Sequence, residues 1–150
     1  MTSPTGTRTD TETLVALRQL LLAVLVFGLV GLTFELFLIG HFKDPWEWVP
    51  IVLQVAALWP TLAVWFRPSR RAVQSLQAMM LLFFLSGVVG LYLHYRGNAE
   101  FELEMYPDLS GFKLLWDALT GATPTLAPGT MMLLSLLGLT VTFRHPALRQ

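Results

Sequence analysis

Three ionisable side chains stand within or directly beside long apolar stretches of this chain. They are Glu35, His41 and His94. A charged group at such a depth usually faces protein or water rather than lipid. Together these side chains offer oxygen and nitrogen ligands for a transition metal, and two imidazoles from different helices could ligate a haem. We expect either a metal or haem site here, or interfacial polar side chains that hold no ligand.

Two of these side chains occupy the same place in a repeated pattern. Residues 28–35 and 87–94 share two glycines, a valine and a leucine at identical spacing, and end in Glu35 and His94. A tandem duplication of a helical hairpin would put both side chains at one depth. The alternative is chance, because membrane helices draw on few residue types. The glycines expected at helix–helix contacts in either case are Gly28, Gly31, Gly87 and Gly90.

Other polar residues are expected near the same depth. Gln54 lies a few residues into the second apolar stretch, and Thr130 lies near the start of the last one. With Glu35 and His94, they give each of four helices one polar group at a similar level. We therefore predict an outward-facing polar pocket that binds an ion or a small ligand. Whether these helix faces converge depends on how the helices pack.

The composition restricts the class of protein. Hydrophobic residues make up 54% of the 150 residues and charged residues 13%. A soluble domain of this size cannot bury that much apolar surface. The net charge is zero, so we expect no nucleic-acid partner. There is no cysteine, which excludes disulfides and cysteine-ligated metal centres.

The apolar residues fall into four stretches, each long enough to cross a hydrocarbon layer about 30 Å thick. Residues 1–13 are polar and are predicted to form a disordered cytoplasmic tail, followed by a four-helix transmembrane domain over residues 14–150. The fold predicted is an all-α membrane protein, arranged as two tandem hairpins with a long outer loop at residues 96–125. The four spans are expected at about residues 14–40, 49–66, 72–95 and 126–143.

Basic residues predict the orientation of these spans. Arginines flank the N-terminal stretch, the connection between the second and third spans, and the C-terminus, whereas the other two connections are rich in acids. Basic residues concentrate on the cytoplasmic side of membrane proteins. We therefore expect a multi-pass protein of the plasma (inner) membrane with both termini in the cytoplasm.

The long outer loop contains two predicted elements. Residues 100–105 alternate acid and apolar side chains, so an extended segment would present Glu100, Glu102 and Glu104 on one acidic face. A short interfacial helix is expected next, beginning near Asp108 or Ser110 and ending near Leu119.

The sequence favours a small accessory or transport-related membrane protein with an outward-facing pocket around Glu35. Two alternatives stay open: a membrane redox protein that binds metal or haem through His41 and His94, and a structural subunit of a larger complex. The constellations of common enzymes are absent, so the sequence favours a membrane enzyme less than these functions. The expected partners are the lipid bilayer and other membrane-protein subunits, and no cofactor is expected unless the histidines bind one.

Overall fold

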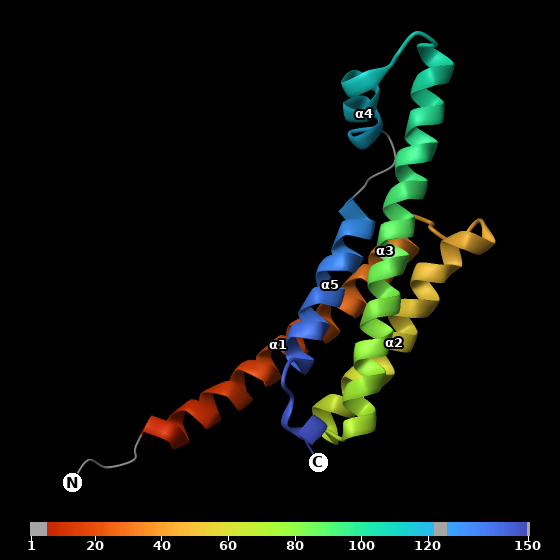
Figure 1. The fold of residues 1–150 in the computed structure, drawn as a ribbon. Helices are drawn as coiled ribbons and strands as arrows, with labels where there is room; N and C mark the ends of the chain where they lie inside the picture. The colour runs from red at the N-terminus through yellow and green to blue at the C-terminus, as the bar shows by residue number, and fades with distance from the viewer. Residues whose placement is uncertain (1–5, 122–125, 150) are drawn as a thin grey trace.

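The computed structural model describes the backbone of residues 6–121 and 126–149 and the side chains of residues 10–121 and 128–149. This part of the chain is helical, with no strand (Figure 1). Ser69 caps one long helix, because its hydroxyl accepts a hydrogen bond from the Ala72 N–H at 3.2 Å. The elements are α1 (Gly6–Leu38), the 3₁₀ turn η1 (Pro45–Glu47), α2 (Trp48–Phe66), α3 (Arg70–Met105), α4 (Gly111–Leu119), α5 (Leu126–Thr142) and the 3₁₀ turn η2 (Pro146–Arg149).

Three of the described helices are long and apolar enough to cross a membrane, namely α1, α2 and α3. The fourth apolar helix, α5, is shorter, with 17 residues. Large apolar side chains point away from the other helices, and Phe27 and Trp59 are 80% and 81% exposed. Contiguous apolar surface of this kind needs an apolar environment. The chain therefore has the character of an integral membrane protein.

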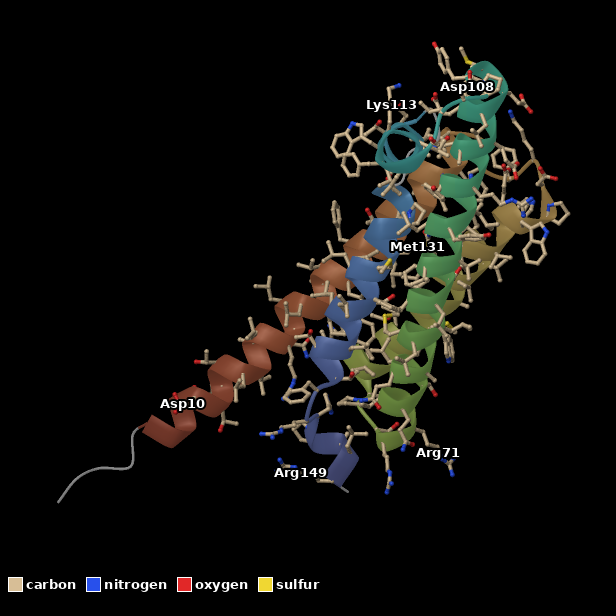
Figure 2. All side chains as sticks on the ribbon, turned by 45° about the horizontal axis from the view of Figure 1, so that its top comes forward. Asp10, Arg71, Asp108, Lys113, Met131 and Arg149 are labelled. Carbon is tan, nitrogen blue, oxygen red and sulfur yellow. The ribbon has the colours of Figure 1, made fainter. Side chains whose placement is uncertain are left out.

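The four apolar helices, α1, α2, α3 and α5, pack side by side in a ring. Helix α1 contacts α2 and α5, and α3 contacts the same two helices from the other side (Figure 1). Side chains from α1 and α3 meet in the interior, where Leu25, Leu29, Leu76, Met80 and Phe83 are fully buried. At one end of the molecule Figure 2 shows Arg71 and Arg149, and at the other end it shows Asp108 and Lys113.

Three of the four repeated glycines lie at helix contacts, as predicted. Gly28 faces Leu134 of α5, while Gly87 and Gly90 face Pro128 at the start of the same helix. Gly31 has no atom of another residue close to the place of a Cβ, so the prediction is wrong for this glycine. Both glycine segments contact α5, at Leu134 in one case and at Pro128 in the other. The internal duplication stays a prediction.

The first helix begins earlier than predicted. It starts at Gly6, so residues 6–13, which were expected to form a disordered tail, are helical. The first turns of α1 diverge from the other helices (Figure 1), and the described side chains from Asp10 to Leu17 are exposed. The helix continues here through its local backbone hydrogen bonds, although threonine, the commonest residue of 6–13, is a weak helix former.

The third helix ends later than predicted. It continues to Met105, so residues 96–105 are helix rather than loop. An extended acidic face was therefore a wrong expectation: Glu100 and Glu104 share one side of a helix, while Glu102 lies on another. Strong helix formers fill this stretch, and Pro107 ends it by forcing Tyr106 out of helical geometry. The short helix predicted after it is present as α4.

Candidate functional site

Two of the predicted site residues meet at the outer end of the bundle, which is defined here as the end with α4. The rings of His41 and His94 stack with centroids 6.2 Å apart and planes 23° apart. Both residues are half-buried, and Nδ1 of His94 is buried with no hydrogen-bond partner in the described part of the chain. Two residues 53 positions apart in the sequence thus form one contact between α3 and the end of α1.

A glycine turn positions His41. Gly40 has a φ of +70°, which costs glycine little because it has no side chain. This geometry lets the His41 N–H donate to Leu36 O at 2.9 Å and the Gly40 N–H donate to Phe37 O at 3.1 Å, which closes the end of α1. His41 therefore emerges from a rigid turn rather than from a free loop.

The connection from α1 to α2 is also held firmly. A Glu47 carboxylate oxygen accepts the backbone N–H groups of Lys43 and Asp44 at 2.6 and 3.3 Å. The Trp48 indole N–H donates to Phe42 O at 3.1 Å. These bonds use polar groups of the loop internally, while the ring of His41 contacts His94 of α3.

Glu35 is not part of this contact. Its side chain is exposed on α1, and neither of the two described cavities contains it. No cluster of three or more histidine, aspartate or glutamate side chains suited to a metal occurs in the described residues. The structure thus brings together two of the three candidate metal ligands.

Gln54 lies elsewhere, in the interface between α1 and α2. It is fully buried, and its Oε1 accepts the Thr33 hydroxyl at 2.7 Å. The same hydroxyl lies 2.7 Å from Leu29 O, and one proton serves only one acceptor at a time. Nε2 of Gln54 is buried without a partner in the described part of the chain. Thr33 was missed by the sequence argument, although it is a polar residue two positions before Glu35.

Thr130 and the acidic residues are separate from both groups. Thr130 is exposed on α5, so it does not line a pocket with Gln54. Glu100 accepts a hydrogen bond from Arg96 Nε at 2.7 Å in an exposed ion pair on α3. Such surface pairs contribute little to stability. The predicted ligand set therefore divides into a histidine pair, a buried amide and scattered exposed groups.

Helix α4 packs on the extension of α3 (Figure 1). Ala118 is buried against α3, where Asn98 Nδ2 donates to Ala118 O at 2.9 Å. Gly121 follows at a close approach to the Asn98 side chain. Asn98 was not anticipated from the sequence, since a lone asparagine in a predicted loop carries no specific signal.

The opposite side of α4 presents aromatic rings. Phe112 and Trp116 stack with centroids 6.4 Å apart and are 76% and 57% exposed. Beneath α4, an apolar groove of about 330 Å³ runs along α3. The groove is lined by Val88, Leu91, Tyr92, Tyr95, Leu115 and Leu119.

Comparisons with protein-family models, with curated proteins and with solved structures find no match to this chain.

Proposed function

We propose that the chain is a four-span protein of the plasma membrane with both termini in the cytoplasm. Its support is the agreement between packing and charge. Helix α5 contacts both α1 and α3. Arg71 and Arg149 lie at the end of the molecule where α2 and α5 end and where the C-terminus lies (Figure 2). At about 1.5 Å per residue, the 17 residues of α5 cover about 26 Å, close to a hydrocarbon thickness of about 30 Å.

Cysteine labelling tests this topology directly, because the chain has no cysteine of its own. The single variants Ser3→Cys, Ser110→Cys and Gln150→Cys probe the two termini and the α3–α4 turn. A membrane-impermeant maleimide applied to intact cells should label only the Ser110 variant, and permeabilised cells should show all three. Labelling of the Gln150 variant in intact cells, without the Ser3 variant, would mean that α5 does not cross.

The role we propose for this protein is that of an accessory subunit, docked through α4 to the outer part of a second integral membrane protein. The single observation that carries it is the exposed Phe112–Trp116 stack on a helix fixed to α3 beyond the apolar bundle. Aromatic side chains are enriched at the energetic centre of protein interfaces. A transport role has less support, because Glu35 is exposed and lines neither described cavity.

Photo-crosslinking in native membranes tests the docking. A photoreactive amino acid in place of Trp116 should yield one dominant protein adduct, and Trp116→Ala should reduce co-purification of that same protein by at least tenfold. The matched control is the same photoreactive residue at Leu85, an exposed residue of α3 that lies within the predicted span. Equal adducts at both positions, or a lone monomer by native mass spectrometry, would contradict the role.

A second candidate function is metal or haem binding by the histidine pair. The observation that favours it is the contact of His41 with His94 and the buried, unpartnered Nδ1 of His94. Imidazole nitrogens are suited to zinc, copper, nickel and iron, with water or a third ligand completing the coordination. Titration with Zn²⁺, with Cu²⁺ and with haemin should each be compared between the wild-type protein and His94→Ala. His145→Ala, at the other end of the bundle, is the control, and binding unaffected by His94→Ala would exclude the pair.

A further inference from the structure

A second cavity lies at the opposite end of the molecule, among the arginines. Its volume is about 240 Å³, and its lining residues come from α1, the end of α2, the end of α5 and the start of η2, with Pro68 and His145 just beyond α2 and α5. Its polar lining consists of Arg18, Gln19 and His145. The apolar lining comes from Val15, Leu22, Val64, Val141 and Ala147, together with two prolines. The cavity therefore has a polar edge above an apolar floor.

Arg18 is held at this edge and forms no ion pair within the described residues. Its Nη2 donates to Phe143 O and Arg144 O at 3.4 and 3.5 Å, at the C-terminal end of α5. A guanidinium has five N–H donors, so these two long bonds leave most of its donor capacity available. The two ion pairs of the described residues, Arg96–Glu100 and Lys113–Asp117, both lie at the outer end. Arg18 thus keeps its positive charge beside a cavity.

The surroundings add to this charge. Arg67 lies in the connection after α2, next to Pro68 of the cavity lining, Arg70 and Arg71 begin α3, and Arg149 ends η2. The acids on this side are Asp10 and Glu12, which precede Arg18 on the diverging part of α1. Glu12 is six residues from Arg18, about 9 Å along the helix at about 1.5 Å per residue. An anion in the cavity would therefore experience a positive field.

The depth of the cavity matches the position of a lipid headgroup. Arg18 lies level with the ends of α2 and α5, since it contacts Phe143 O and shares a cavity with Val64 and Pro68. From Arg18 to Leu38, where α1 ends, the helix covers about 30 Å at about 1.5 Å per residue, equal to the hydrocarbon thickness of about 30 Å. The polar edge then falls in the headgroup layer and the apolar floor at the ends of the acyl chains nearest the glycerol.

We propose that this cavity binds one anionic phospholipid of the adjoining leaflet, with the phosphate on Arg18 and an acyl chain on the apolar floor. Basic pockets between transmembrane helices are suited to such headgroups. Guanidinium groups bind phosphate oxygens through short, charge-assisted hydrogen bonds. The apolar lining favours a lipid over free phosphate, because an acyl chain would cover the exposed side chain of Val15 and phosphate would not. The proposal rests on the protein being embedded in a membrane, but not on its orientation or on the role of α4.

Native mass spectrometry of the full-length protein from a neutral detergent tests the site. Short-chain phosphatidylglycerol should form a one-to-one complex at concentrations at least tenfold below those needed for phosphatidylcholine of the same chain length. Inorganic phosphate should not compete at tenfold excess over the lipid. Arg18→Gln should weaken phosphatidylglycerol binding about tenfold, the loss expected for one charge-assisted contact. Arg18→Lys should recover part of it.

Two further variants separate a specific site from general attraction. Val15→Trp fills the cavity while keeping Arg18 and its bonds, and should weaken binding to the same degree. Arg71→Gln removes an equal charge at the same end but outside the cavity lining, and should leave binding within twofold of wild type. Equal binding of the two lipids, competition by phosphate, or equal losses in the Arg18→Gln and Arg71→Gln variants would overturn the proposal. Because lipid binding is measured in detergent, its outcome is independent of the topology and docking experiments.

Discussion

At the scale of single residues, the polar groups of the bundle differ in how well their hydrogen bonds are satisfied. Gln54 is fully buried with one partnered and one unpartnered atom. His145 at the arginine end has its Nδ1 occupied by the Ala147 N–H at 3.2 Å. We therefore expect that replacement of Gln54 raises the free energy of unfolding, and that protonation of His145 lowers it.

Replacement of Gln54 by methionine should stabilise the protein. The substitution removes the bond to Thr33, and interhelical bonds in membrane proteins contribute about 0.6 kcal/mol on average. It also removes a buried donor without a partner, which costs about 1–3 kcal/mol. We expect the free energy of unfolding in mixed micelles to rise by about 1 kcal/mol. Gln54→Glu, which buries a carboxyl group at the same place, should lower it by at least about 2 kcal/mol. A destabilised methionine variant would indicate that Nε2 has a partner essential to the fold.

The stability should also depend on His145. Burial and the positive charge of Arg18 lower the pKa of His145 from its ordinary value. The unfolded chain, with a histidine pKa of about 6.5, then binds a proton more readily than the folded chain. The stability that neutral His145 contributes is fully present above about pH 6.5 and is lost as the pH falls through the folded-state pKa of this residue. Protonation of Nδ1 would also break its bond from the Ala147 N–H.

Unfolding measured in detergent between pH 8 and pH 5 checks this dependence. His145→Asn keeps a side-chain acceptor for a nearby N–H but does not titrate, so its free energy of unfolding should fall less steeply with acidification than that of the wild type. Parallel profiles for the two proteins would show that other groups cause the acid sensitivity.

At the scale of elements, the contact between α3 and α5 depends on a glycine. A Cβ on Gly87 would lie 2.7 Å from Met132 Cγ and 2.9 Å from Pro128 O, and the carbonyl belongs to the backbone and cannot move cheaply. Gly31, in α1, has nothing within 4 Å of the same position. The two glycines come from the same repeated pattern, so they form a natural pair for comparison.

Gly87→Ala should therefore lower the free energy of unfolding by about 2 kcal/mol, the usual cost of overpacking. Gly31→Ala should raise it by up to about 1 kcal/mol, since alanine favours helix more than glycine does. Thermal unfolding of both variants in one detergent gives the comparison. A similar change in both would mean that helix propensity, rather than the close approach to Pro128, decides the effect.

At the scale of the whole molecule, arginines at one end and acids at the other are proposed to set its orientation in the membrane. Arg67, Arg70 and Arg71 form the densest basic group, and they lie in the short connection after α2 and in the first turn of α3. Short basic loops have the greatest influence on membrane topology. A part of the molecules should therefore insert in the opposite orientation when these three arginines lose their charge.

The triple variant Arg67→Gln, Arg70→Gln, Arg71→Gln should give mixed orientations. In intact cells, a Ser110→Cys reporter on this background should be labelled only in part by an impermeant maleimide. The matched control, Lys113→Gln with the same reporter, removes a single basic charge at the other end and should stay fully labelled. Complete labelling of the triple variant would show that the remaining arginines suffice to fix the topology.

The sequence by itself determined the composition-based class, the apolar helices, the short helix before Gly121 and the separation of arginines from acids. These follow from local hydropathy, capping residues and charge counts. It did not determine where α1 begins or where α3 ends. Polar residues such as those at 6–13 and 96–105 are compatible with both helix and loop, and no apolar period distinguishes them.

Only the tertiary structure decided which side chains meet. Position along a helix gives depth in the membrane, but rotation about the helix axis is set by packing against neighbours. For this reason His41 meets His94 and Gln54 meets Thr33, whereas Glu35, predicted at the depth of His94 and Gln54, turns outward. At the other end Arg18 reaches the end of α5. The sequence thus predicted the depth of each polar residue. The packing of α1, α2, α3 and α5 decided which polar residues at one depth contact one another and which are exposed.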